Sequence, residues 1–186
     1  MNIRKLHRKI APVLFLPLLL TALTGVMYRV GRAWLGVPDN VAEVLMSIHE
    51  GRFLGSPLVP FYVLSMGLGL VVLLATGLKL VKRKATKAKV KRNQRWVHRL
   101  VGTITCLPLL VSAVTGIAYR LGDAWFGIPE SQSSVLMMIH EGRYLGTTLR
   151  PFYVLFVGAG LIVLLVTGIQ MTGIFRKKNK LQSSES

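Results

Sequence analysis

The chain has 186 residues, of which 52% are hydrophobic and 17% charged, and its formal net charge is +17. The apolar fraction excludes an intrinsically disordered chain, and the single cysteine, Cys106, excludes a disulfide-rich secreted scaffold. A soluble nucleic-acid-binding protein would account for the charge but not for a mean hydropathy of +0.51. The composition therefore indicates a small membrane protein, provided that the apolar residues form long runs.

Four apolar runs predict four transmembrane helices, over about residues 10–30, 60–80, 100–120 and 151–175. A helix of about 20 residues crosses roughly 30 Å of hydrocarbon. The first run is long and is followed by a second span, so we expect a retained helix and not a cleaved signal peptide. The predicted fold is an all-α membrane protein, a bundle of four transmembrane helices.

The distribution of Lys and Arg predicts the orientation of this bundle. Of the 24 basic residues, 18 precede the first span, occupy the middle loop or follow the last span. The two remaining loops carry six arginines and six acidic residues. By the positive-inside rule, both termini and the middle loop are predicted to be cytoplasmic. The net charge is thus a signal of topology, and we expect a lipid bilayer and no nucleic acid as partner.

An internal repeat appears when the chain is aligned to itself at an offset of 91 residues. Roughly half of the positions from Arg4 to Leu78 are then identical, and the alignment needs no gap. We divide the chain into a first two-helix repeat (1–81), a basic linker (82–94), a second repeat (95–175) and a polar tail (176–186). Because each repeat crosses the membrane twice, both share one orientation, which predicts a pseudo-twofold axis along the membrane normal.

The repeat turns the four histidines into two pairs. His7 and His98 lie at the cytoplasmic ends of the first and third spans, whereas His49 and His140 lie in the outer loops. The expected axis places the members of each pair opposite one another, as a b-type haem requires of its two axial ligands. Pairing within one repeat fails, because the 22 residues from His7 to Arg29 extend about 33 Å as a helix.

We therefore predict two non-covalently bound haem b groups, one near each membrane face. His7 and His98 would hold the cytoplasmic-side haem iron, and His49 and His140 the outer-side iron. Covalent attachment is excluded, because the sequence has no C-x-x-C-H motif.

Charged residues near the histidines are candidates for supporting roles. Four arginines are expected to pair with haem propionates, namely Arg8, Arg99, Arg52 and Arg143. Glu50 and Glu141 either accept a hydrogen bond from the adjacent imidazoles or pair with Arg52 and Arg143. Met46 and Met137 are weaker candidates as iron ligands, and packing in a loop helix over 41–50 or its equivalent is the simpler interpretation.

A structural role for the histidines is the alternative. A histidine beside basic residues at a helix end is usually interfacial, and any residue of a duplicated gene occurs twice. All four histidines have nevertheless persisted while about half of the aligned positions have changed. This selective retention favours ligation.

Several motifs resemble those of the PepSY-associated transmembrane proteins. They are Arg4-Lys5-Leu6-His7-Arg8, Leu23-Thr24-Gly25, His49–Gly55 and Thr76-Gly77, with the same set 91 residues later. The resemblance implies a bacterial inner-membrane protein with His7, His49, His98 and His140 as b-haem ligands; a thylakoid membrane stays the alternative. It also implies ferric-reductase-like activity, as in iron-regulated members that reduce ferric siderophores. Outer loops of about 30 residues leave no room for the PepSY domains that family members usually carry.

The hypothesis from the sequence is a dihaem b-type cytochrome that moves electrons across the bilayer. Its donor would be external, a quinol or a cytoplasmic reductase or ferredoxin, and its acceptor would lie on the outer side. The competing hypothesis is a non-redox membrane subunit or assembly factor whose histidines are structural or bind copper or zinc. The sequence leaves the oligomeric state open.

Overall fold

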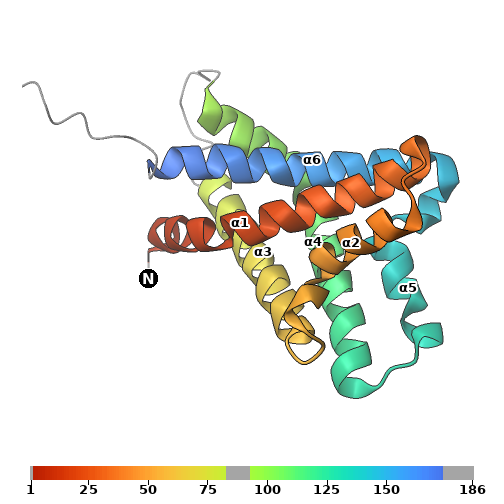
Figure 1. The fold of residues 1–186 in the computed structure, drawn as a ribbon. Helices are drawn as coiled ribbons and strands as arrows, with labels where there is room; N and C mark the ends of the chain where they lie inside the picture. The colour runs from red at the N-terminus through yellow and green to blue at the C-terminus, as the bar shows by residue number, and fades with distance from the viewer. Residues whose placement is uncertain (1, 83–92, 174–186) are drawn as a thin grey trace, which may run out of the picture.

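The computed structural model describes residues 2–82 and 93–173. Within these ranges every regular element is helical (Figure 1). The six α-helices are α1 (Ile3–Val30), α2 (Asp39–Glu50), α3 (Val59–Lys82), α4 (Gln94–Phe126), α5 (Glu130–His140) and α6 (Gly146–Thr172). A π-helical turn covers Gly31–Leu35, and 3-10 turns cover Arg52–Leu54 and Arg143–Leu145. Most of the predicted linker and all of the predicted tail lie outside the described residues.

Four helical segments are long and apolar enough to cross a membrane, namely Ile3–Leu35, Val59–Val81, Gln94–Phe126 and Arg143–Thr172. The predicted all-α membrane fold with four spans is therefore confirmed, and the protein is a multi-pass membrane protein. The first and third helices begin earlier than the apolar runs, because side chains outside the runs cap them. Asn2 accepts a hydrogen bond from the backbone of Arg4, and Asn93 accepts one from that of Trp96.

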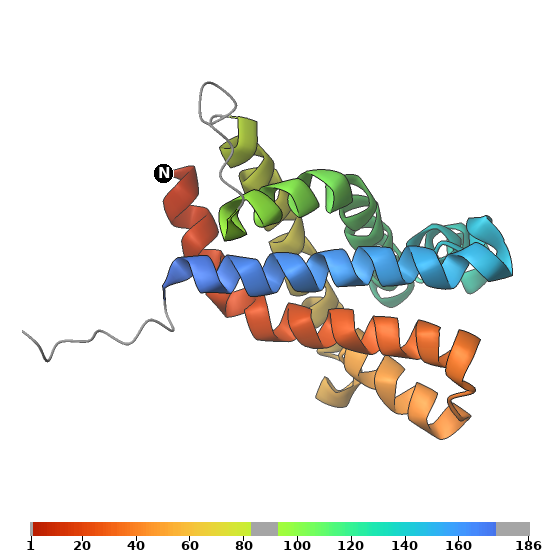
Figure 2. The same cartoon turned by 90° about the horizontal axis from the view of Figure 1, so that it is seen from above.

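The four long helices form a ring in which α1 and α4 each pack against both α3 and α6. Figure 2 shows α6 flanked by α1 and α4. The short helices cover one end of this ring, since α2 packs on α1 and α5 packs on α4. This end lies away from the N-terminus (Figure 1). The arrangement gives the bundle two different ends, one built by long helices alone and one closed by loop helices.

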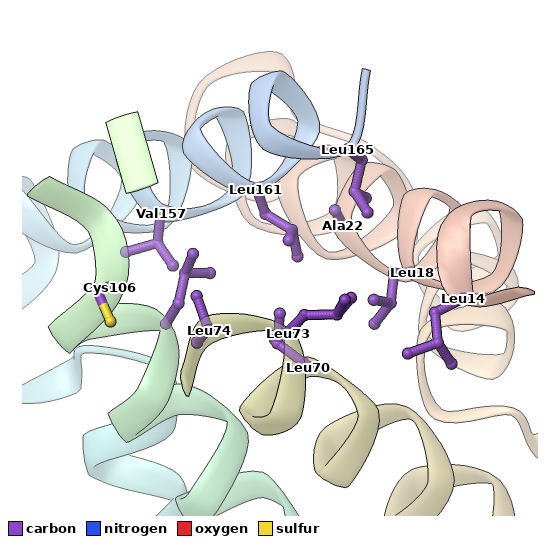
Figure 3. Close-up of a cluster of buried hydrophobic side chains, with 11 residues drawn as sticks. Leu14, Leu18, Ala22, Leu70, Leu73, Leu74, Cys106, Val157, Leu161 and Leu165 are labelled. Carbon is purple, nitrogen blue, oxygen red and sulfur yellow. The ribbon is translucent and has the colours of Figure 1, made fainter. Parts of the chain in front are cut away.

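The interior of the ring is a leucine-rich core to which all four long helices contribute (Figure 3). The outer surface of the bundle is also apolar, with Val13 exposed by 74% and Leu107 by 69%. A soluble protein rarely exposes so many large apolar side chains on its helices, whereas a lipid-facing helix does. Small residues allow close helix contact: a Cβ at Gly67 or Gly160 would lie 2.5 Å from Ile117 or Thr105.

Aromatic pairs connect the two repeats near the covered end. The ring of Trp34 lies 4.9 Å from that of Phe152, and the ring of Trp125 lies 5.6 Å from that of Phe61. Trp125 and Phe152 are the 91-residue equivalents of Trp34 and Phe61, so the two contacts are reciprocal. They agree with the pseudo-twofold relation, which stays a prediction.

Candidate functional site

Each histidine pair lies at one end of the bundle. The first, which we term the inner pair, is His7 on α1 and His98 on α4. Hydrogen bonds bring the surrounding helix ends together, from the Arg8 guanidinium to the Thr172 carbonyl at 3.3 Å and from Gln94 to Gln170 at 2.8 Å. The second, termed the outer pair, is formed by His49 and His140 at the C-terminal ends of α2 and α5.

The outer pair is brought together across the repeats. The ring centroids of His49 and His140 are 6.4 Å apart, and the ring planes are inclined by 60°. Two metal–nitrogen bonds of about 2 Å, with the dimensions of the two imidazoles added, separate such centroids by about 6 Å. The spacing therefore suits one metal ion between the two rings. α2 ends at Glu50, one residue after His49, and α5 ends at His140 itself. Gly51 in the left-handed region (φ 76°) turns the chain after α2.

Hydrogen bonds define the tautomer of the outer histidines. Nδ1 of His49 lies 2.8 Å from the carbonyl oxygen of Thr21, and Nδ1 of His140 lies 2.8 Å from that of Ser112. A carbonyl oxygen only accepts, so Nδ1 must carry the hydrogen and Nε2 keeps its lone pair. This is the arrangement found in metal-binding histidines, whose second nitrogen donates to a carbonyl or carboxylate.

Burial also holds the outer histidines in the neutral, ligand-competent form. Desolvation lowers the pKa of His49 to about 4 and is only partly opposed by the hydrogen bond to Thr21. The pKa of His140 is lowered by burial as well. Both imidazoles are therefore neutral at physiological pH.

A cavity of about 550 Å³ adjoins the outer pair. Both repeats line it, with Tyr62, Tyr153, Met46 and Met137 among the larger side chains. Its charged lining consists of Arg29, Arg120, Arg143, Arg150, Glu50, Glu130 and Glu141. A volume in this range is typical of sites for cofactors and other small ligands.

The inner histidines adopt the same tautomer through side-chain partners. Nδ1 of His7 lies 2.8 Å from the Thr76 hydroxyl, which donates its single hydrogen to the Val72 carbonyl at 2.7 Å. The hydroxyl oxygen must therefore accept from Nδ1 of His7, and Nε2 keeps its lone pair. His98 and Thr167 form the equivalent bond, also at 2.8 Å. The cavity beside this pair is only about 90 Å³ and is lined mostly by aliphatic residues, among which leucine is the most frequent.

Each of the four histidines lies against the glycine of a Thr-Gly pair. A Cβ at Gly25 would lie 2.8 Å from Cε1 of His49, whereas one at Gly77 would lie 3.7 Å from Cε1 of His7. In the sequence, the Thr-Gly pairs were recognisable only as a family motif, and their contact with the histidines was missed. Their recurrence in every span, at positions that match between the repeats, was the available signal. The contacts are His49 on Gly25, His140 on Gly116, His7 on Gly77 and His98 on Gly168.

The arginines proposed for propionates lie in different settings. Arg99 lines the inner cavity and Arg143 the outer one. Arg8 donates to a backbone carbonyl, and Arg52 pairs with Glu43 at 2.5 Å and Glu50 at 2.9 Å. Arg29, Arg120 and Arg150 line the outer cavity and were missed. The first two carried a signal, since the Tyr-Arg dipeptide recurs as Tyr28-Arg29 and Tyr119-Arg120.

The two acidic residues beside the outer histidines form ion pairs. Glu50 contacts Arg52, and Glu141 contacts Arg143 at 3.3 Å. These are the pairs that the sequence offered as the second role for the glutamates. Backbone carbonyls accept the imidazole hydrogen bonds instead.

The number of protein ligands bears on which metal these sites suit. Within residues 2–82 and 93–173, no group of three or more His, Cys, Asp or Glu side chains is placed to hold a metal ion. Structural zinc requires four protein ligands. Haem iron receives four nitrogens from the porphyrin and needs two from the protein, which is the number that each histidine pair offers.

Comparison with known families identifies the chain. The family model described as the PepSY-associated TM region matches residues 36–134, which is more than half of the 186 residues. The chain belongs to this family. The matched region of this PepSY-associated protein runs from before α2 into α5 and contains His49 and His98. No curated protein and no solved structure matches it significantly.

Proposed function

We propose that this PepSY-associated membrane protein is a b-type cytochrome that transfers electrons across the bilayer as a ferric- or metal-reductase-like component. The observation that carries the proposal is the outer pair. Two neutral imidazoles stand 6.4 Å apart beside a cavity of about 550 Å³, and both keep a free Nε2.

His49 and His140 would hold haem b at this site, and the haem would supply one-electron chemistry; ligation by two histidines favours electron transfer over oxygen binding. The chain itself fixes the two rings. The Thr21 and Ser112 carbonyls orient them, and Gly25 and Gly116 allow their Cε1 and Nδ1 atoms to lie close against α1 and α4. Burial keeps them unprotonated.

A second haem at the inner pair completes the proposal. The tautomers and glycine contacts match those of the outer pair, but a cavity of about 90 Å³ is smaller than a porphyrin. Binding there requires leucine side chains such as Leu73 and Leu164 to change rotamer. The two cavities share Leu70 and Leu161 in their linings. On α1, His7 and the Thr21 carbonyl are 14 residues apart, about 21 Å along the helix, so the sites would be stacked along the bundle.

The proposed orientation places the inner pair on the cytoplasmic side of a bacterial inner membrane, following the positive-inside rule. A quinol or a cytoplasmic reductase or ferredoxin would reduce the inner haem, and an acceptor on the other side would oxidise the outer one. The basic cytoplasmic surface would raise the encounter rate with an acidic donor.

The experiment is a haem assay on protein purified in detergent, combining reduced-minus-oxidised spectra with the haem-to-protein ratio. We expect two haems per chain and a b-type α-band. His49→Ala and His140→Ala should each remove the same haem, and His7→Ala and His98→Ala the other. Met137→Leu is the control, because it changes the cavity lining without removing a histidine.

Two outcomes would contradict parts of the proposal. A haem-to-protein ratio of one that falls to zero only in the His49 and His140 variants would contradict the inner haem. Purified, folded protein with no extractable haem and no reconstitution by added haem would overturn the cytochrome proposal, and would favour the non-redox subunit with structural histidines.

A further inference from the structure

Ion pairing in the outer cavity differs between the two repeats. In the first, Glu50 receives Arg120 of the other repeat at 3.1 Å and Arg52 at 2.9 Å. In the second, the equivalent Glu141 contacts Arg143 at 3.3 Å and also Arg150. The two glutamates therefore have different partners, although their positions in the repeats are equivalent.

One position explains this difference. Arg150 aligns with Val59 of the first repeat, so only the second repeat has an arginine there. Arg150 donates to both the carboxylate and the backbone carbonyl of Glu141. Arg29 is the 91-residue equivalent of Arg120, so the repeat predicts an ion pair between Arg29 and Glu141 like the one between Arg120 and Glu50. Arg150 already occupies that carboxylate.

Arg29 consequently lacks, within the described part of the chain, the carboxylate partner that its equivalent Arg120 has. Among the described residues it forms no ion pair, and its buried Nε has no hydrogen-bond partner. Glu141 is near enough to interact with it electrostatically, but is held by Arg150 and Arg143. A buried guanidinium nitrogen without a hydrogen-bond partner is costly unless an acceptor joins it, and an anion is the strongest acceptor for a guanidinium.

We propose that Arg29 binds a carboxylate of the ligand in the outer cavity. The inference rests on the proposed function, in which that carboxylate is a haem propionate. Arg29 and the histidines line the same cavity, and Arg29 lies at the end of α1, where a propionate would reach the membrane surface. Guanidinium pairs with carboxylate through two parallel hydrogen bonds. Arg52 and Arg143, the sequence-based candidates, are already paired with glutamates.

The test is titration of the haem-free full-length protein in detergent with ferric haem and with ferric haem dimethyl ester, which lacks the carboxylates. To confine binding to the outer cavity, all proteins carry His7→Ala. The Arg29-containing parent should bind haem about tenfold more tightly than the ester, a typical value for a charge-assisted pair. Arg29→Gln should remove this preference by weakening haem binding alone.

Two further variants separate Arg29 from a general effect of positive charge. Arg120→Gln removes the same charge from the equivalent position, and the tenfold preference should persist because Arg120 is already neutralised by Glu50. Arg150→Val leaves Arg29 intact but frees Glu141 to pair with it, so the preference should fall. This variant also keeps the test decisive if Arg29→Gln does not fold.

The outcomes distinguish this inference from the proposed function. Haem binding with a preference that survives Arg29→Gln and Arg150→Val would overturn the role of Arg29 and leave the cytochrome intact. An equal loss of the preference in Arg120→Gln would overturn the role of Arg29, because it would show that the positive charges around the cavity act together and not through one residue. Absence of binding of either probe to the parent protein would overturn the cytochrome proposal itself.

Discussion

The outer and inner ends of the bundle hold the same side chain in different surroundings. At the outer end the histidines adjoin about 550 Å³ and donate to backbone carbonyls. At the inner end they adjoin about 90 Å³ and donate to threonine hydroxyls. A helix carbonyl cannot rotate away, whereas a hydroxyl belongs to a side chain with its own rotamers. The inner imidazoles also have backbone contacts, His7 with Leu73 and His98 with Leu164, but their closest acceptors are hydroxyls, so we expect the outer imidazoles to be the more firmly oriented pair.

The origin of the difference lies in the elements that carry the histidines. His49 and His140 come from α2 and α5, which lie beside α1 and α4 and leave space between the repeats. His7 and His98 belong to the long helices themselves, whose leucines fill the space around them. One repeated unit thus builds a preformed site at one end and a closed site at the other, and a ligand should reach the outer site with less rearrangement.

The largest expected difference in haem affinity between the outer and inner pairs comes from replacing the glycines that contact the rings. In Gly25→Ala the new Cβ would lie 2.8 Å from Cε1 of His49, so the ring must move. We expect haem affinity at the outer pair to fall about 100-fold, the upper range for loss of a group that orients a ligand. Gly77→Ala is the matched control at the inner pair, because its Cβ would lie at an ordinary 3.7 Å from His7.

Haem titration measures the haem affinity of each variant in this series, and circular dichroism measures its helix content. Alanine favours a helix over glycine by about 1 kcal/mol, so the helices should persist while haem is lost. Gly116→Ala and Gly168→Ala should fall between the two, since their Cβ atoms would lie 3.0 Å and 3.3 Å from the imidazoles. Equal haem retention in Gly25→Ala and Gly77→Ala would show that these contacts do not position the rings.

A smaller effect is expected from removing the hydroxyl acceptors. Thr76→Val and Thr167→Val remove the hydroxyl acceptor of the inner histidines and leave only the backbone contacts of His7 with Leu73 and of His98 with Leu164. We expect inner haem affinity to fall about tenfold. Thr21→Val is the matched control at the outer pair, because His49 uses the carbonyl of Thr21 and not its side chain. Stopped-flow haem release from each variant provides the measurement. A similar increase in the rate of haem release for Thr21→Val and Thr76→Val would contradict the distinction between carbonyl and hydroxyl acceptors.

The fold was predictable because long apolar runs in a membrane protein leave little choice but helices. The helix starts at Ile3 and Gln94 were not, since they depend on caps outside those runs. The pairing of His49 with His140 followed from the repeat alone. The partner of each imidazole did not, because it depends on which atoms of a neighbouring helix lie within 3 Å, and hydropathy carries no such information. The isolation of Arg29 depends on the single difference between Val59 and Arg150, which has meaning only once Glu141 is located.

The smallest expected effect is on the pH dependence of the free energy of unfolding, which tests whether the outer histidines are buried. An unfolded histidine takes up a proton near pH 6.5, whereas His49 in the folded, haem-free protein does so only near its pKa of about 4. Below pH 6.5 the unfolded state therefore binds more protons, and the free energy of unfolding falls as the pH falls toward 4. Between pH 6.5 and 5.5 the loss should be about 1 kcal/mol for this histidine, measured by chemical unfolding in micelles. His49→Gln should reduce the pH dependence by that amount, and His140→Gln should act in the same direction, because burial lowers the pKa of His140 too. A pH dependence unchanged by His49→Gln would mean that water reaches this ring, and the outer site would then have no advantage in burial over the inner one.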